Sequence, residues 1–213
     1  VNVDLKTFSV EYADKTATRL GEFDPDNGNL THEAIERVIE ALRRFKELAN
    51  SYKVHKLIIA ATSAVREAPN GKEFINRIKQ DLKLDVELIS GAEEGRLIYL
   101  GVLSGMHFAD RPHILIDIGG GSTELIIGEG QAIDELASTH MGCVSWTERF
   151  FKRGKLTKEA FLEAEKAAQQ NLNPIARKYR NSGWIKVIGT SGTIKAVGSA
   201  LQSTGITSGD ITP

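Results

Sequence analysis

A short stretch at residues 114–128 constrains the fold of this chain more than any other, because it joins two apolar runs through a glycine turn. Its sequence is ILIDIGGGSTELIIG. The two runs are typical of buried strands, and each carries one carboxylate, Asp117 before the turn and Glu124 after it. Glycines lack a Cβ, so the backbone N–H groups of the turn can approach a bound anion. Two acids beside such a turn suit a phosphate with a divalent cation, and the alternative is a hairpin turn without a ligand.

The composition is that of a globular protein with one large domain or two small ones. The chain has 213 residues, and 41% of them are hydrophobic, which is enough for a core. Its 27 basic and 28 acidic residues nearly cancel, so we expect neither nucleic acid nor another polyanion to be gathered by the bulk charge. We find no long apolar run and no secretory leader, and we expect no membrane partner. A single cysteine, Cys143, predicts no internal disulfide and a cytoplasmic location.

The first part of the chain alternates strand-like and helical patterns. Residues 5–12 and 16–20 alternate apolar and polar positions, which predicts a hairpin, and a helix is expected after Thr31. The run LIIAA at 57–61 predicts a buried parallel strand. Arg66 follows that strand, where open α/β sheets bind ligands. Its guanidinium suits a phosphate or carboxylate, and a surface ion pair with a nearby glutamate is equally consistent with the sequence.

Two adjacent glutamates open the next helix, expected at 92–103. Ser90 and Glu93 fit a capping box, in which each residue's side chain binds the backbone N–H of the other. Glu94 has no such structural role and falls on the apolar side of the helix. It is therefore either paired with an arginine, Arg96 or Arg66, or placed for proton transfer.

A second small-residue turn follows a strand expected at 184–188. The sequence GTSGT at 189–193 leads into a helix with Lys195 near its start, and a helix N-terminus is a natural phosphate site. A simple helix cap is the alternative. Residues 105–112 have the composition of a linker, so we expect two domains, 1–107 and 108–213.

The absence of two known nucleotide-binding motifs argues against some classes of protein. Neither turn contains Gly-Lys-Ser/Thr, which argues against a P-loop ATPase, and neither is G-x-G-x-x-G. The order of three strands, helix, strand and helix resembles the actin/sugar-kinase/Hsp70 ATPase superfold. This resemblance implies an α/β fold of two ribonuclease H-like domains, each a mixed sheet flanked by helices, with a cleft between them.

Within that superfold the chain closely resembles the exopolyphosphatase / guanosine pentaphosphate phosphohydrolase family. Five motifs in order carry the resemblance: IIAATSAVREAPNG, ELISGAEEGRLIYLGVL, ILIDIGGGSTELIIG, HMGCVSWTERFF and VIGTSGTIKAVG. The resemblance implies hydrolysis of the terminal phosphoanhydride of inorganic polyphosphate with Mg²⁺ or another divalent cation. In some members it implies hydrolysis of the 5′-phosphate of guanosine pentaphosphate.

The family roles carry over to matching positions. Glu94 matches the catalytic base, Asp117 and Glu124 match the acids that hold the metal and the attacking water, and Arg66 matches an arginine that contacts phosphate. The remaining matches are to phosphate-binding segments, at Gly119, Gly120, Gly121, Ser122, Thr123, Cys143, Gly189, Ser191, Gly192, Thr193 and Lys195.

The chain departs from the family pattern at its start. Members open with a further strand and a first phosphate turn of the form D-[IL]-G-[ST]-N-S, which is absent here, and both domains are expected to be truncated. Three hypotheses follow: an exopolyphosphatase, a guanosine pentaphosphate phosphatase, or a binding-only module without activity. A sugar kinase or ATPase ranks last. A homodimer is possible on the sequence.

Overall fold

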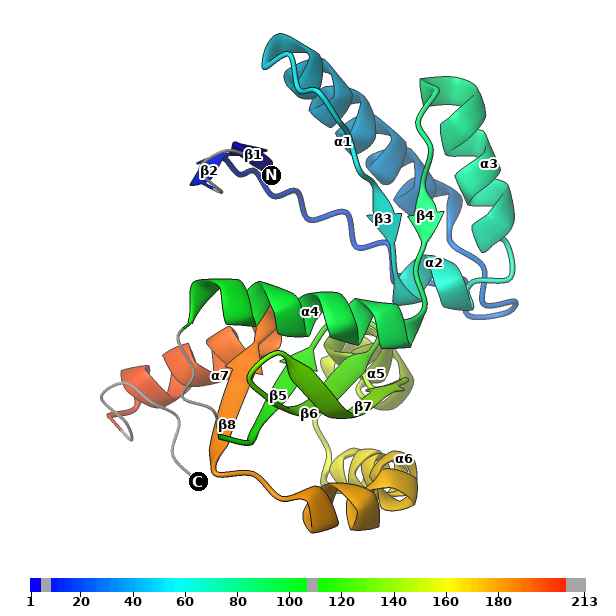
Figure 1. Ribbon diagram of the computed structural model, residues 1–213. Helices are drawn as coiled ribbons and strands as arrows, with labels where there is room; N and C mark the ends of the chain where they lie inside the picture. The colour runs from blue at the N-terminus through cyan, green and yellow to red at the C-terminus, as the bar shows by residue number, and fades with distance from the viewer. Residues whose placement is uncertain (5–8, 107–110, 206–213) are drawn as a thin grey trace. The chain divides into compact units, whose positions relative to one another are not determined.

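The computed structural model describes residues 1–4, 9–106 and 111–205 of the chain. It divides the chain into two compact units, Val1–Ile89 and Ser90–Pro213, whose helices and strands are drawn in Figure 1. None of the described helices is both long and apolar enough to cross a membrane.

The first unit consists of a hairpin, helices and a small parallel sheet. The hairpin pairs β1 with β2 antiparallel, and the sheet pairs β3 with β4 in parallel. In chain order the elements are β1 (Asn2–Asp4), β2 (Ser9–Tyr12), α1 (His32–Ser51), β3 (Ala60–Ala61), α2 (Ser63–Glu67), α3 (Gly71–Leu82) and β4 (Glu87–Leu88).

The core of the first unit lies between α1 and α3. The side chain of Thr31 accepts a hydrogen bond from the Ala34 amide and begins α1, as the sequence predicts. Apolar residues at helical spacing then place one face of each helix on the core, with Ile39 from α1 and Phe74 and Ile78 from α3 almost fully buried. This packing fixes the helices that lie beside β3 and β4.

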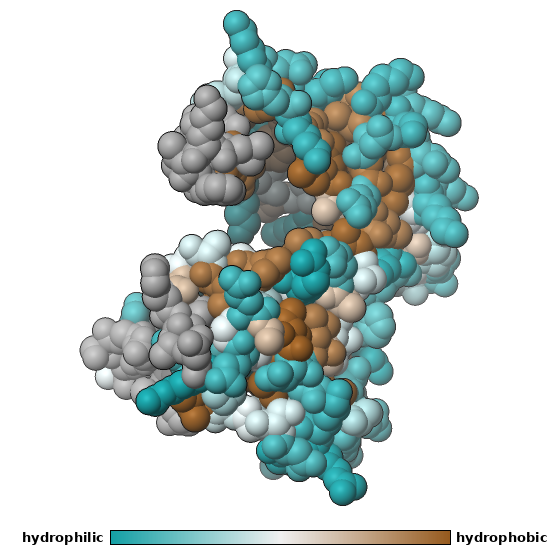
Figure 2. Space-filling view, viewed as in Figure 1, coloured by the Kyte–Doolittle hydropathy of each residue, from teal (hydrophilic) through white to brown (hydrophobic). Residues whose placement is uncertain are grey.

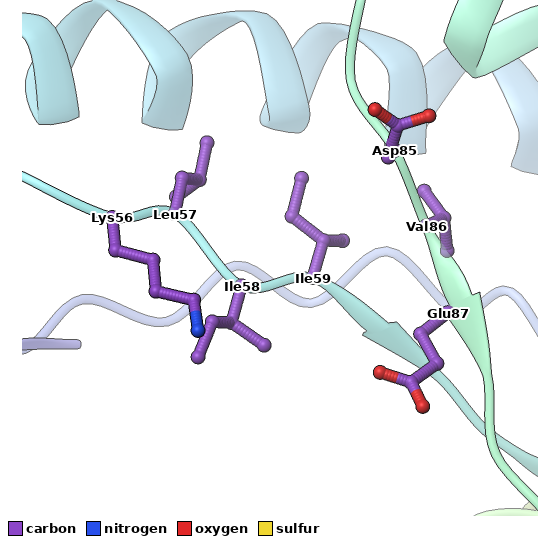
Figure 3. Close-up of a pocket in the computed structure, with 7 residues that line it drawn as sticks. All are labelled: Lys56, Leu57, Ile58, Ile59, Asp85, Val86 and Glu87. Carbon is purple, nitrogen blue, oxygen red and sulfur yellow. The ribbon is translucent and has the colours of Figure 1, made fainter.

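The strand predicted at 57–61 is shorter than expected. Only Ala60 and Ala61 pair with β4, while Leu57 and Ile58 are 48% and 70% exposed. Figure 3 shows the hollow beside this segment, with Leu57 and Ile59 pointing toward α1 and Ile58 pointing away. Hydrophobic surface is correspondingly visible over β3 and β4 in Figure 2. The expectation failed because the pairing with β4 ends at Ile59, whose carbonyl accepts a hydrogen bond from the Glu87 amide, and within the described residues no strand lies beside Leu57 and Ile58.

The hairpin predicted at the start of the chain also differs. It is built from β1 and β2, not from 5–12 and 16–20, and residues 5–8 lie outside the described part. Residues 13–19 form no strand, because arginines of α1 hold this segment against the helix. Arg44 donates to Asp14 and Thr16, and Arg37 donates to the carbonyl of Thr18.

The second unit is built on a mixed four-stranded sheet with the strand order β7-β6-β5-β8. β5, β6 and β7 are antiparallel neighbours, whereas β8 joins β5 in parallel. The elements are α4 (Gly91–Gly105), β5 (His113–Ile118), β6 (Thr123–Glu129), β7 (Ala132–Thr139), α5 (Cys143–Phe150), the 3-10 helix η1 (Lys152–Gly154), α6 (Lys158–Ser182), β8 (Lys186–Thr190) and α7 (Ser191–Ser203). This arrangement confirms the predicted α/β class and a mixed sheet flanked by helices.

Helices cover both faces of this sheet (Figure 1). Successive strand residues face opposite sides, so Leu115 and Ile126 pack against Tyr99 of α4, while Ile114 and Ile127 pack on the other face against Tyr179 of α6. Every one of these side chains is nearly or fully buried. Because helices cover both faces of the sheet, the sequences of β5 and β6 are nearly continuous apolar runs.

Helix α4 lies with the second unit, which differs from the predicted boundary at 107/108. The division falls between Ile89 and Ser90, and α4 packs on β6 and β7 through Tyr99 and Ile98. The linker composition of residues 105–112 suggested the boundary, but the apolar side of α4 decides the packing. Glu94 therefore belongs to the same unit as the glycine turn.

Tyr179 joins α6 to the sheet by a buried hydrogen bond. Its hydroxyl donates to the Leu125 carbonyl at 2.7 Å, and burial raises the pKa of this phenol to about 12. We expect Tyr179→Phe to lower the free energy of unfolding by about 1–2 kcal/mol, because the Leu125 carbonyl loses its additional donor. Urea denaturation measures the change. Tyr52→Phe, at an exposed position, is the control, and an equal loss in both variants would contradict this role.

Candidate active site

Four polar side chains form one row across the carboxyl end of β5 and β8. The strand register places Ser138 opposite Glu124, Glu124 opposite Asp117, and Asp117 opposite Thr190. The Ser138 hydroxyl donates to the Glu124 carboxylate at 2.8 Å, and the Thr190 hydroxyl donates to the Asp117 carboxylate at 2.6 Å. Two carboxylates thus lie side by side, each held by a hydroxyl from an outer strand.

The row lies on the face of the sheet that α4 covers. Asp117 follows Leu115 by two residues, and Glu124 precedes Ile126 by two residues, so the carboxylates share the face of these two core side chains. Glu124 is 1% exposed. Burial is the largest cause that raises the pKa of Glu124. Hydrogen bonds from Ser138 and Ser122 lower this pKa, while the negative charges of Glu94 and Asp117 raise it further.

Glu94 lies in the first turn of α4, and its negative charge influences Glu124. The Ser90 hydroxyl oxygen accepts a hydrogen bond from the Glu93 amide at 3.1 Å, which confirms one of the two hydrogen bonds of the predicted capping box. The Glu93 carboxylate does not complete the box, because it binds Arg96 through two hydrogen bonds of 2.7 and 2.8 Å. Arg96 is therefore held by Glu93. Glu94 is half-buried, and its charge acts on Glu124.

Close packing brings the start of α4 onto the sheet. A Cβ on Gly95 would lie 3.2 Å from Leu136, which precedes Ser138 by two residues on β7. Gly95 thus allows the helix backbone to approach the strand that supplies one end of the row. Local sequence and packing together place the first turn of α4, which carries Glu94, against this sheet.

The glycine turn is held in shape by α5. The Gly119 amide donates to the Ser122 carbonyl, and the amides of Cys143 and Val144 donate to the carbonyls of Gly119 and Gly120. Gly142 permits this contact, because a Cβ there would lie 2.2 Å from the Gly120 carbonyl oxygen. Cys143 therefore meets the turn through its backbone.

The turn keeps donors free for a ligand. In the described part of the chain, the backbone N–H groups of Gly120 and Gly121 donate to no protein acceptor. Thr123 is held from behind, since its hydroxyl donates to the Met141 carbonyl. Free N–H groups beside two carboxylates suit an anion accompanied by a cation.

The second turn joins the same site through Thr190. Thr190 is the N-cap residue of α7, but its hydroxyl binds Asp117 and makes no cap hydrogen bond, so the simple helix cap is not observed. Ser191 has φ +73°, in the left-handed region that a serine adopts only at a cost. Gly189 lets Ile194 approach, since a Cβ there would lie 2.4 Å from it.

The remaining residues of this turn open α7. Gly192 and Thr193 lie in its first turn, where helix amides have no partner within the helix, and Lys195 follows on the exposed side. Because β8 is parallel to β5, α7 starts at the same end of the sheet as the glycine turn, beyond the carboxyl ends of both strands. Both predicted phosphate turns are therefore at one edge of one sheet.

Arg66 belongs to the first unit. Its guanidinium donates to the Ile89 carbonyl at 2.9 Å, which ties α2 to the residue just before Ser90. Its contact with a phosphate stays a prediction. The other predicted site residues all lie in the second unit.

The donor set fits a hard divalent cation bound together with a phosphate. Mg²⁺ in phosphate-transfer sites takes one or two carboxylates, and phosphate oxygens and waters complete its coordination. Asp117 and Glu124 supply such a pair. Across residues 1–4, 9–106 and 111–205, no group of three or more histidine, cysteine or acidic side chains is arranged to hold a metal by itself. Magnesium at this pair stays a prediction.

The sequence reasoning did not identify Ser138 and Thr190 as site residues. Thr190 was within the predicted turn and could have been found as the hydroxyl next to a strand end. Ser138 had no local signal, because its role depends on register between strands. Fourteen residues separate it from Glu124 along the chain.

Comparisons with known proteins identify the family. Residues 2–213 match the profile of the Ppx/GppA phosphatase family, and the chain belongs to that family. The chain is similar to an exopolyphosphatase from Cytophaga hutchinsonii of known crystal structure, with 28% sequence identity and a TM-score of 0.87. The match covers 95% of this chain and 65% of that one. An Aquifex aeolicus member of the Ppx/GppA family is 32% identical, with a TM-score of 0.66 over 86% of this chain and 58% of that one. The chain therefore spans less than two thirds of these relatives.

The raised pKa of Glu124 predicts a pH-dependent stability. A carboxyl with a higher pKa in the folded state binds more protons there, so its contribution is present at low pH and is lost as pH rises from about 4.3 through the raised value. We expect the free energy of unfolding of Glu124→Gln, minus that of the wild type, to increase across this range. Denaturant titrations at several pH values measure the difference. A constant difference would contradict the assignment.

Ser138 is expected to matter most when Glu124 is ionised. Ser138→Ala removes a hydroxyl that stabilises the buried carboxylate, and we expect a loss of about 1.5–3 kcal/mol of unfolding free energy near neutral pH. The loss should shrink at a pH where Glu124 is protonated. Thr139→Val, on the opposite face of the same strand, is the matched control, because its hydroxyl binds a backbone carbonyl. A pH-independent loss in Ser138→Ala would refute this role.

Proposed function

We propose that this chain carries the hydrolytic centre of a phosphatase that releases the terminal phosphate of inorganic polyphosphate. One observation carries the proposal: the negative charge of Glu94 acts on Glu124, the cross-strand partner of Asp117, beside a glycine turn whose Gly120 and Gly121 amides have no acceptor among the described residues. Membership of the Ppx/GppA phosphatase family supports the reaction class, and similarity to a protein named an exopolyphosphatase supports the substrate.

The two turns would bind the terminal phosphoryl group. The free amides of Gly120 and Gly121 would donate to its oxygens, and the first amides of α7, at Gly192 and Thr193, would add donors at the positive end of a helix dipole. Donors fixed in place before the reaction stabilise developing charge without reorganising. Arg66 is proposed to add a permanent positive charge.

Asp117 and Glu124 would hold Mg²⁺. The cation would supply charge neutralisation for the phosphoryl oxygens. The chain's own part is to orient both carboxylates, and the hydroxyls of Ser138 and Thr190 do this by donating hydrogen bonds. The Ser138 hydrogen bond also opposes the rise in the pKa of Glu124 that burial causes.

Glu94 would act as the general base. Phosphoryl transfer to water requires a group that orients the water and accepts its proton, opposite the bridging oxygen that leaves. Glu94 lies in the first turn of α4 and its negative charge raises the pKa of Glu124, whereas its neighbour Glu93 binds Arg96. The leaving chain would take its negative charge into solvent.

Glu94→Gln is expected to lower phosphate release from polyphosphate by a factor of about 10² to 10⁴, because the amide cannot accept the proton. The fold should be retained, as measured by circular dichroism and denaturant unfolding. The assay uses this chain with Mg²⁺ and measures inorganic phosphate.

Glu93→Gln is the matched control, because it removes the adjacent carboxylate that is bound to Arg96. It should retain most of the activity. Full phosphate release by Glu94→Gln would rule out this residue as the base. Guanosine pentaphosphate is assayed in parallel, and hydrolysis of it without release from polyphosphate would favour the second substrate.

A further inference from the structure

Helix α5 and the glycine turn satisfy each other's backbone groups. The first amides of a helix have no acceptor within that helix, and the N-cap residue Gly142 has no side chain that could supply one. The Cys143 amide donates to the Gly119 carbonyl at 2.9 Å, and the Gly120 carbonyl accepts from the next two amides of α5 at 2.9 and 3.1 Å. The carbonyls of the turn therefore cap the helix.

These hydrogen bonds decide which way the amides of the turn point. In a trans peptide unit the C=O group and the N–H group of the following residue point in opposite directions, and no described peptide bond is cis. The Gly119 carbonyl shares its peptide unit with the Gly120 amide, and the Gly120 carbonyl shares its unit with the Gly121 amide. Because α5 binds both carbonyls, both of these amides point away from α5.

Helix α5 lies on the side of the sheet opposite to the two carboxylates. Phe151, at the end of α5, packs on Phe161 of α6 with 4.9 Å between ring centroids. Helix α6 covers the sheet face that carries Ile114, whereas Asp117 and Glu124 lie on the other face. Amides that point away from α5 therefore project toward the side of the carboxylates.

Gly142 is the residue that allows α5 to come so close to the turn. A Cβ on Gly142 would lie 2.2 Å from the Gly120 carbonyl oxygen and 2.2 Å from the Gly121 amide nitrogen, which belong to one peptide unit. The backbone conformation does not require glycine here, because φ −111° and ψ 152° are accessible to any residue. The missing side chain therefore serves only the close approach to the peptide unit that carries the Gly121 amide.

We propose that Gly142 is a positioning residue of the glycine turn, because it lets α5 hold the Gly120 and Gly121 amides toward a phosphoryl group before the ligand binds. The inference rests on the proposed function, since it takes the turn as the phosphate-binding element. Gly142 would act only through the orientation of two peptide units. Donors that are held in place in this way stabilise developing charge without reorganising.

Gly142→Ala tests the proposal in the full chain. The added Cβ should displace the peptide unit between Gly120 and Gly121, so kcat for phosphate release from polyphosphate should fall by a factor of about 10² to 10³, with a smaller change in KM. Amide hydrogen exchange, followed by NMR, is the second measurement. Inorganic phosphate with Mg²⁺ should slow the exchange of the Gly120 and Gly121 amides about tenfold in the wild type, and this slowing should be lost in Gly142→Ala.

Cys143→Pro tests the same orientation without a new Cβ at position 142, and it decides the question if Gly142→Ala does not fold. Proline fits the first position of a helix, and here it removes the amide that binds the Gly119 carbonyl. The slowing of exchange by phosphate should again be lost at Gly120. Circular dichroism measures whether each variant keeps its fold.

The matched controls are Gly101→Ala, where a Cβ meets nothing within 4 Å, and Lys158→Pro, at the first position of α6. Both should keep the response of the turn amides to phosphate, and an equal loss in them would overturn the proposal. A full response in Gly142→Ala and Cys143→Pro, or no response in the wild type, would also overturn it. If the wild-type amides respond to phosphate but no phosphate is released from polyphosphate, the proposed function fails, and the exchange rates still decide on Gly142.

Discussion

The candidate site of the second unit depends on two carboxylates that lie opposite each other on neighbouring strands. Asp117 and Glu124 are cross-strand partners in the interior of a sheet, where like charges repel and burial penalises ionisation. Hydroxyls from the two outer strands offset part of this cost, and Ser122 adds a further hydrogen bond to Glu124. Apolar side chains alone would give a more stable sheet. The retained charge is therefore best explained by a ligand that needs it.

The fold gathers the rest of the site at the same edge of the sheet. The antiparallel hairpin of β5 and β6 supplies the turn, and parallel addition of β8 brings the start of α7 to the same edge. The first amides of helix α5 donate hydrogen bonds to the carbonyls of the glycine turn. The amides of Gly120 and Gly121 in that turn have no acceptor among the described residues. Helix α4 contributes Glu94 from above the same face. One sheet thus positions the proposed catalytic base, the proposed cation ligands and the proposed anion donors.

Much of this site was predictable from sequence because its main parts lie in one short stretch. Asp117, the glycines and Glu124 are contiguous, and an acid in an apolar run is a strong local signal. Ser138 was not predictable, since its contact depends on strand register, which no local pattern encodes. The predicted boundary at 107/108 put α4 in the first domain because residues 105–112 have the composition of a linker, whereas the apolar face of α4 packs on the sheet of the second unit. The strand at 57–61 was overestimated because apolar residues form a strand only where a partner strand lies beside them.

The most direct test of the central claim is the binding of a divalent cation together with phosphate at the Asp117 and Glu124 pair. Mn²⁺ can replace Mg²⁺ as the probe, and electron paramagnetic resonance with pyrophosphate present reports both the bound ion and its coupling to phosphorus. The account predicts a bound Mn²⁺ signal with phosphorus coupling in the wild type. It predicts loss of that signal in Asp117→Asn, and its retention in Asp134→Asn on the same sheet. Binding that survives Asp117→Asn unchanged would contradict the account.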